Sequence, residues 1–520
     1  MHTTTDLFEL IQSLTPQEKK YFRRYTALHV RGEKNKYMLL FEAIAKQTRQ
    51  SSKKRNGGGQ EYYDEEKLKK QFRHEKFMNQ FAVAKNYLCS QILKSLRSYH
   101  HSTHSEVKDL IRNAEILFEK GLSKQSQKYI KKAKKIAREH EMHHALMEIF
   151  HYWELKLALK NIDVSWIQNI LREEAEEISL LKNKNFYSNN YFRLVVHYQL
   201  YGPVRNKKHF GQIKKMMHSR FLTDIAMAKT FQAKLYFHDA HVVYFRIIDD
   251  RRGLYHSSKN IITLFKKHPE RIRRSVSVFV AYLNNVLDAC TQNKKYNEMP
   301  FYLNELESLA PLAKSSHEKA KIFYYAAINR LNYYNITGQF SNAVSPILEI
   351  KKQFDEYKQF MGDFEKAFLF QNIAMFYFGA RQYKNCIHWL NRIRNEISLN
   401  ISHDLESFLR LFYIIVHYEA GNMDLLIPLI QSLYRYLKKK EQLYKFETII
   451  IIFFRNEFPK TNTQQERAHT FQKLKNKLLL LTKDEYEKNA FEYFDYISWL
   501  ESKIENRPFA EVVRQKAISV

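Results

Sequence analysis

The chain has 520 residues, of which only 12 are glycine and 9 are proline, so few of its residues favour tight turns. That scarcity disfavours β-sandwiches and α/β folds, and an apolar fraction of 44% excludes a disordered chain. The net charge of +30 favours partners that carry negative charge, namely nucleic acid, acidic protein or anionic lipid, unless the lysines only form a solvated face.

Residues 1–105 predict a basic N-terminal helical domain. The segment SLTPQEKKYFRRY holds a helix start, with Thr15 as N-cap, Pro16 at the first helical position and Glu18 closing a capping box. A helix-turn-helix is the alternative interpretation of this region, but its turn lacks glycine, so a plain helical hairpin is favoured. The segment TRQSSKKRNGGGQE then predicts a mobile loop near 47–61, and a long helix or helix pair follows it.

Residues 106–455 contain turn-like positions that recur about every 40 to 48 residues, with helical apolar spacing on both sides. This spacing predicts repeated pairs of antiparallel helices, each helix roughly 18 residues long. The turn-like positions are Gly121, Asn161, Arg205, Gly253, Lys294, Gly338, Arg381 and Gly421.

The clearest of these units has a Gly-x-aromatic-x-x-Ala turn, formed by Gly338, Phe340 and Ala343, with Asn329 nine residues before the glycine. This pattern resembles the tetratricopeptide repeat, most clearly over 280–430. The period of about 42 residues is longer than that of the family. The chain is also similar to uncharacterised bacterial helical-repeat proteins.

The resemblance implies an all-α fold, a right-handed α-solenoid of about eight or nine helix pairs. Residues 106–455 would form the repeat array, and 456–520 would supply C-terminal capping helices. The first helix of each pair would line a concave groove that holds a partner. By position, the groove side would include Asn284, Asp288, Asn332, Asn335 and Gln371. The resemblance assigns structural roles, tying neighbouring helices together, to Asn285, Asn329 and Asn372.

One motif raises the question of a metal site. HEMHH, from His140 to His144, matches HExxH, which on a helix would place those two histidines one turn apart, with Glu141 as a general base. The extended zinc-protease pattern fails, because Met147 stands where glycine is needed. We therefore expect a solvated polar face here, with a zinc hydrolase only as a third hypothesis.

Other catalytic signatures are missing from the sequence. It contains no GxxxxGK[ST], GxGxxG or GxSxG motif. Its three cysteines, Cys89, Cys290 and Cys386, lie far apart in apolar contexts, as small core residues of a protein in a reducing compartment do. We expect no enzyme activity, no catalytic residue and no cofactor.

Basic residues gather in three segments of the first three-fifths of the chain. If they face one groove they would hold phosphates, and binding would weaken steeply with salt. Nucleic-acid binding by the basic N-terminal half is therefore the main alternative function. The predicted basic surface consists of Lys128, Lys131, Lys132, Lys135, Arg138, Lys207, Lys208, Lys266, Lys267, Arg271, Arg273 and Arg274.

The favoured interpretation is a non-catalytic scaffold or adaptor that holds a protein or peptide segment in its groove, where the positive charge would favour an acidic segment. The N-terminus has no basic segment followed by an apolar one, so no signal peptide is expected. The longest apolar run, 449–454, is too short to enter a bilayer as a span. These features predict a cytoplasmic protein without membrane insertion, and they leave its oligomeric state open.

Overall fold

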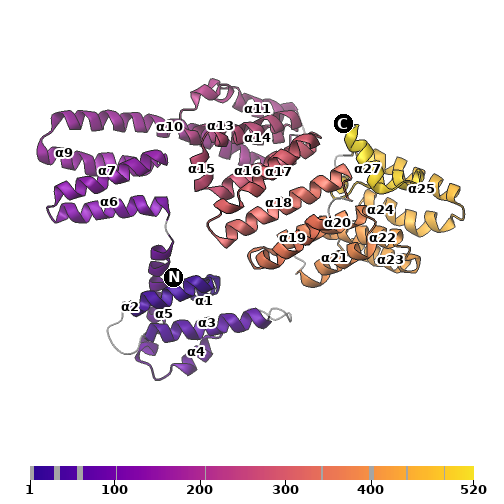
Figure 1. Ribbon diagram of the computed structural model, residues 1–520, viewed down its shortest axis with the longest axis horizontal. Coiled ribbons are helices and arrows are strands. Elements are labelled where there is room, and N and C mark those ends of the chain that lie inside the picture. Colours follow the sequence, from indigo (N-terminus) through magenta and orange to yellow (C-terminus); the bar gives the residue numbers. More distant parts are fainter. Residues whose placement is uncertain are drawn as a thin grey trace. The chain divides into compact units, whose positions relative to one another are not determined.

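The computed structural model is all-α over the residues that it describes, which confirms the all-α part of the predicted fold (Figure 1). No described helix is both long enough and apolar enough to cross a membrane. The described residues are 5–28, 36–54, 63–100, 102–204, 207–340, 344–397, 403–440, 443–484 and 487–519.

The chain divides into two compact units, Met1–Leu181 and Lys182–Val520. Helix α10 (Val164–Tyr201) runs through the boundary between them. The other helices of the first unit are α1 (Asp6–Ser13), α2 (Pro16–Leu28), α3 (Lys36–Lys54), α4 (Glu65–Gln71), α5 (Phe81–Tyr99), α6 (Thr103–Glu119), α7 (Ser123–Glu139), α8 (His143–Glu148) and α9 (Leu155–Asn161).

The predicted start of α2 is confirmed in detail. The backbone amide of Thr15 donates to the Glu18 carboxylate at 2.7 Å, and the amide of Glu18 donates to Thr15 Oγ1 at 3.2 Å. These two bonds satisfy amides that a helix start otherwise leaves without a partner. Farther on, α3 continues to Lys54, and residues 55–61 of the predicted loop lie outside the described residues.

The second unit is built from helices that pack in sequence. They are α11 (Lys207–Met217), α12 (Arg220–Thr223), α13 (Phe231–Ile247), α14 (Arg251–Lys266), α15 (Pro269–Arg274), α16 (Val276–Gln292), α17 (Met299–Ser308), α18 (Ser316–Thr337), α19 (Val344–Tyr357), α20 (Asp363–Gly379), α21 (Tyr383–Glu396), α22 (His403–Glu419), α23 (Met423–Lys439), α24 (Lys445–Ile452), α25 (Gln464–Leu481), α26 (Tyr496–Ile504) and α27 (Phe509–Ile518).

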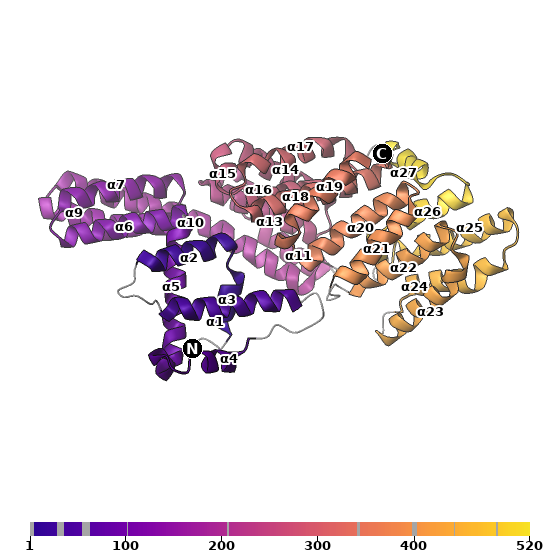
Figure 2. The same cartoon turned by 60° about the horizontal axis from the view of Figure 1, so that its bottom comes forward.

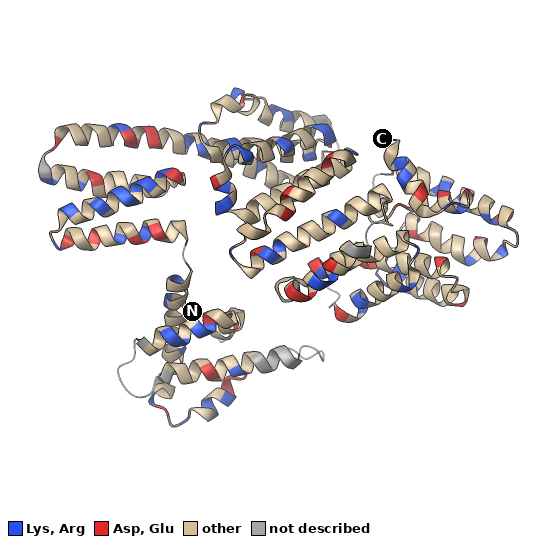
Figure 3. Ribbon diagram, in the orientation of Figure 1, with Lys and Arg blue, Asp and Glu red and all other residues tan. Residues whose placement is uncertain are grey.

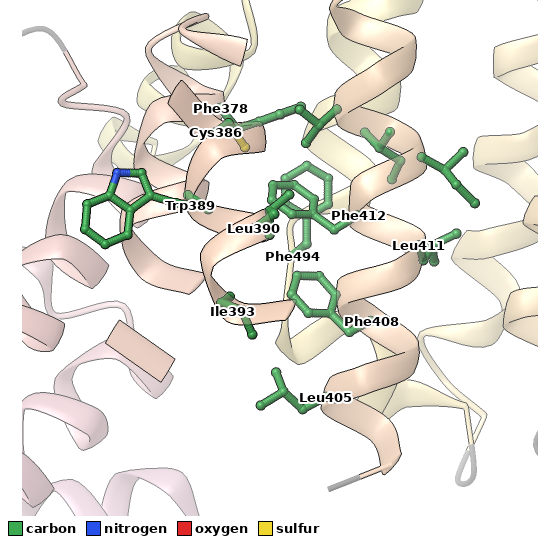
Figure 4. Packing of buried hydrophobic residues seen from close by; sticks show 14 of the residues in the cluster. Phe378, Cys386, Trp389, Leu390, Ile393, Leu405, Phe408, Leu411, Phe412 and Phe494 are labelled. Atoms are coloured by element: carbon green, nitrogen blue, oxygen red, sulfur yellow. The ribbon is translucent and has the colours of Figure 1, made fainter. Parts of the chain in front are cut away.

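Most helices from α13 to α23 pack against the next members of the series, for example α13 on α14, α18 on α20 and α22 on α23, and the pairs lie beside one another in both views (Figures 1 and 2). Aromatic side chains fill the space between pairs. Phe378 of α20 packs on Phe412 of α22 with ring centroids 5.3 Å apart, and on Phe494 at the same distance (Figure 4). Cys386 is fully buried beside them, as expected of a small core residue.

A residue with left-handed backbone ends the first helix of several pairs. Gly121, Lys294, Gly338, Arg381 and Gly421 all have positive φ, at or beside the predicted turn positions. Such a residue reverses the chain just after a helix, which is the C-cap geometry that glycine permits most easily. The predicted turns are therefore confirmed at these five positions.

Two other predicted turns are misplaced. Gly253 lies inside α14, and the left-handed residue of that pair is Asp249. Near Asn161 the left-handed residue is Ile162. Arg205 lies outside the described residues, and the positive φ nearest to it belongs to Gly202. A glycine or short polar residue in the sequence predicts the position of a turn only approximately. A residue one to four positions away can adopt the left-handed backbone that reverses the chain.

The repeated pairing also breaks at α10. The sequence predicts two helices between the turns near residues 161 and 205, but 38 residues form one continuous helix there. Apolar side chains at helical spacing continue through the expected break without glycine or proline, so nothing ends the helix.

The C-terminal helices do more than cap the last pair. The Arg514 guanidinium of α27 donates to the Gly338 carbonyl at 3.1 Å. A Cβ on Gly338 would lie 2.6 Å from the Ala510 carbonyl oxygen. Helix α27 therefore reaches back to the turn after α18, and glycine is needed there for close approach as well as for its φ of 67°.

Candidate functional site

The HExxH motif lies across a turn between two helices. Helix α7 ends at Glu139, His140 follows it as C-cap, and α8 begins at His143. Glu141 has left-handed backbone, with φ of 52°. The expectation that His140 and His144 lie one turn apart on one helix face is therefore wrong.

The middle histidine of this motif has a structural contact. His143 is buried, and its Nδ1 forms a hydrogen bond with the Glu177 carboxylate of α10. Over the described part of the chain, no three histidine, cysteine, aspartate or glutamate side chains group as metal ligands would. The polar side chain at the centre of this turn thus ties α8 to α10.

The basic residues predicted on α7 are exposed. Blue lysine and arginine positions recur along α7 in Figure 3. Two of them form ion pairs with neighbouring helices, Lys132 with Glu106 at 3.5 Å and Arg138 with Glu173 at 2.7 Å. The other three form no ion pair with any described residue, and they recur at helical spacing on one stripe: Lys128, Lys131 and Lys135.

The second basic group lies at the end of α14 and in α15. Lys266 pairs with Glu305 at 2.5 Å, and the Arg271 guanidinium lies 4.9 Å from the centroid of the Phe231 ring. Lys267 and Arg273 are exposed, Arg274 is half-buried, and the side chains of Lys207 and Lys208 are not described. Because α7 and α15 belong to different units, a shared groove for these residues stays a prediction.

The predicted asparagine tie between neighbouring helices exists, with one change of residue. Asn329 of α18 is buried, and its amide donates to Asn284 Oδ1 of α16 at 2.8 Å. Asn285 is exposed, so Asn284 takes the tying position that the sequence assigned to Asn285. Asn372 donates to a backbone carbonyl of its own helix at 2.8 Å.

Two other predicted groove residues lie on the same side of these helices. The Asn332 amide donates to Thr291 Oγ1 of α16 at 3.3 Å. Asp288 is exposed and accepts a bond from Gln292 at 2.9 Å, yet desolvation by the surrounding protein raises its pKa above the ordinary value.

The remaining two predicted groove residues have buried polar atoms without partners. Neither Nδ2 nor Oδ1 of Asn335 has a hydrogen-bond partner among the described residues, and the same holds for Gln371 Oε1. Gln371 is only 3% exposed, and its Nε2 has a single weak contact, with Met375 Sδ at 3.8 Å. A buried amide group without a hydrogen-bond partner lowers the stability of a protein by about 1–3 kcal/mol, so these unpaired atoms destabilise the unbound protein.

No protein-family model, curated protein or solved structure matches this chain. Its function therefore has to be inferred from the chemistry of its own side chains.

One polar site was not predicted from the sequence. Asp239 of α13 accepts a hydrogen bond from the Tyr282 hydroxyl of α16 at 2.9 Å, and burial raises its pKa to about 7. A sequence signal does exist. The positions three and four residues before and after Asp239 hold Leu, Tyr and two Val residues, so no lysine or arginine on its own helix can pair with it.

A small cleft lies among α21, α22 and α23, with a volume of about 120 Å³. Its polar lining includes the ion pair of Glu406 and Arg410, 2.8 Å apart, and Arg394. The Tyr436 hydroxyl donates to Glu406 at 2.7 Å, and Arg410 lies 4.1 Å from the Tyr436 ring centroid. Both charges are thus already compensated within the protein.

Proposed function

We propose that the helix pairs between α13 and α23 form a right-handed solenoid of tetratricopeptide-like repeats that acts as a non-catalytic scaffold or adaptor. Left-handed residues at Asp249, Lys294, Gly338, Arg381 and Gly421 support this architecture, since they are spaced by about 40 to 45 residues. In such an array, the first helices of successive pairs (α13, α16, α18, α20 and α22) would line one continuous surface.

The observation that carries the proposed function is the unpartnered amide chemistry on α18 and α20. A carboxamide side chain offers one acceptor and two donors, which match the N–H and C=O groups of an extended peptide. The buried atoms of Asn335 and Gln371 lack partners among the described residues. If the two side chains turn outward, an extended peptide segment lying across these helices would supply those partners and recover the free energy that the unbound amides forfeit.

The test uses the full chain and a displayed library of random peptides. Selected peptides are synthesised with a fluorophore, and their affinities are measured by polarisation for the wild type and for Asn335→Ala/Gln371→Ala. With three hydrogen bonds lost at about 1 kcal/mol each, the double variant should bind roughly 150-fold more weakly. The matched control is Gln472→Ala/Asn476→Ala, which removes an exposed amide pair of α25 that bonds only to itself, at 2.9 Å.

Two results would contradict the proposal. One is a library that yields no peptide with saturable binding. The other is a set of peptides whose affinities fall equally in the α18/α20 variant and the α25 control, because binding would then not depend on the unpaired amides.

A second candidate function is nucleic-acid binding by α7. The observation that favours it is the stripe of Lys128, Lys131 and Lys135, exposed charges that no described residue pairs. Three phosphate contacts would give a steep dependence of affinity on salt. A gel-shift series with duplex DNA tests this idea, and absence of binding even at low salt removes it.

A further inference from the structure

Asp239 is an isolated carboxyl group in a protein of high positive charge. It lies half-buried on α13, and no described lysine, arginine or histidine forms an ion pair with it. Among the described side chains, the Tyr282 hydroxyl alone donates a hydrogen bond to it, at 2.9 Å. Burial without a cation disfavours the ionised form, which is why the pKa of Asp239 rises to about 7.

Three tyrosines from three helices surround this carboxyl group. Tyr191 of α10 and Tyr236 of α13 have ring centroids 5.7 Å apart, and Tyr282 of α16 adds the third ring. The negative charge of Asp239 contributes to a raised pKa at all three phenols, so each hydroxyl lies within electrostatic range of it. Asp239 and the three tyrosines are each only partly buried, so each contributes some exposed surface.

This combination of aromatic rings and a carboxyl group favours a positively charged ligand. The faces of aromatic rings carry negative potential and attract ammonium and guanidinium groups, and a desolvated carboxylate adds a full charge of the same sign. We infer that Asp239, Tyr191, Tyr236 and Tyr282 form a binding pocket for the cationic side chain of a lysine or arginine residue. The inference rests on the proposed peptide-binding function when it takes that residue to belong to a peptide partner.

No described lysine or arginine forms an ion pair with Asp239, and the nearest basic groups on its own helix are histidines. The adjacent histidines on α13 are neutral at pH 7, because burial lowers the pKa of His238 to about 4 and also lowers the pKa of His241. The groups that act on Asp239 from α10, α13 and α16 are the three phenols, which are uncharged at that pH. A bound cation would therefore not have to displace an ion pair formed by a described residue.

The titration of Asp239 gives this site a pH dependence. Only the ionised carboxylate attracts a cation strongly, and half of the unbound sites are ionised near pH 7. Affinity for a lysine or arginine probe should thus rise about tenfold between pH 6 and pH 8, over which the probes themselves keep their charge.

The test uses three small probes on the full chain: the N-acetyl N-methylamides of lysine, arginine and norleucine. Saturable binding is measured by ligand-observed NMR at about pH 8. We expect the lysine or arginine probe to bind at least about tenfold more tightly than norleucine, and Asp239→Asn to abolish the difference. Asp355→Asn, which changes an exposed carboxylate on α19, is the matched control and should have no effect.

The outcomes separate this inference from the proposed function. Equal binding of all three probes, or a preference unchanged by Asp239→Asn, overturns the pocket even if library peptides bind at Asn335 and Gln371. Charge-selective binding that requires Asp239 supports the pocket even if no library peptide binds, and in that case the groove proposal alone has failed.

Discussion

Replacing Asp239 by asparagine should stabilise the unbound protein, and the gain should depend on pH. The pKa of this carboxyl rises from 3.8 to about 7 on folding. A tenfold change in an acid dissociation constant corresponds to about 1.4 kcal/mol, so ionising Asp239 in the folded state costs up to about 4 kcal/mol. Asparagine keeps an acceptor for the Tyr282 hydroxyl and removes the charge, so it avoids this cost.

The sign follows from proton linkage. The folded state holds the proton of Asp239 more tightly than the unfolded state, so the stability from the neutral acid is full below pH 3.8. It is lost progressively as the pH rises to about 7. Asp239→Asn should therefore match the wild type near pH 4 and exceed it most above pH 7, by a few kcal/mol.

Hydrogen exchange of the α13 and α16 amides in increasing urea measures this difference within the second unit. The control is Asp355→Asn, because Lys358 lowers the pKa of that carboxyl and removing its charge should give a small loss of stability instead. A difference between Asp239→Asn and wild type that stays constant from about pH 4 to pH 8 would refute the argument, since burial of the charge would not be its cause.

Three further changes test other parts of the fold. Gly338→Ala should destabilise the second unit by more than about 1 kcal/mol in urea unfolding, because alanine disfavours a positive φ and its Cβ would lie 2.6 Å from a carbonyl oxygen. Gly211→Ala is the control, and it should be neutral or stabilising because open space surrounds that position in α11. Glu419→Gln should increase hydrogen exchange of α26 several-fold, since the carboxylate accepts from Trp499 Nε1 at 2.7 Å and pairs with Lys503 at 2.6 Å. His144→Ala should leave zinc affinity unchanged in a metal titration, and a tenfold loss would show that the turn at Glu141 still allows ligation.

The sequence predicts local features whose cause lies within a few residues. The capping box of Thr15 and Glu18 needs only one helix start, and the left-handed turns at Lys294, Gly338 and Arg381 need only the end of one helix. Such features follow from backbone groups that must find partners close by, so a single segment is enough to predict them.

Features that depend on contacts between distant segments were missed or only half predicted. The tie at Asn284 differs from the predicted one by a single position, because helix rotation in the packed pair decides which asparagine points inward. No sequence feature near α27 predicts the contact of Arg514 with Gly338, which lies 176 residues earlier in the chain. The surroundings of Asp239 come from three helices, so its sequence neighbours revealed only that no cation was near.

The effect of salt on binding affinity distinguishes a negatively charged partner from a peptide that binds Asp239 through a lysine. The charge of +30 acts over the whole surface, but at physiological ionic strength its field decays within about 10 Å. For an acidic partner or a nucleic acid, added salt screens attraction and must weaken binding.

For a peptide that places one lysine at Asp239, the long-range field opposes approach and the attraction acts only at short range, where the pocket excludes ions. Moderate salt should then leave the affinity unchanged or improve it, with a faster association rate. Titrations of one selected peptide from about 50 to 300 mM salt give the sign directly. A steep loss of affinity with salt would mean that the basic surface, and not the carboxylate pocket, holds the partner.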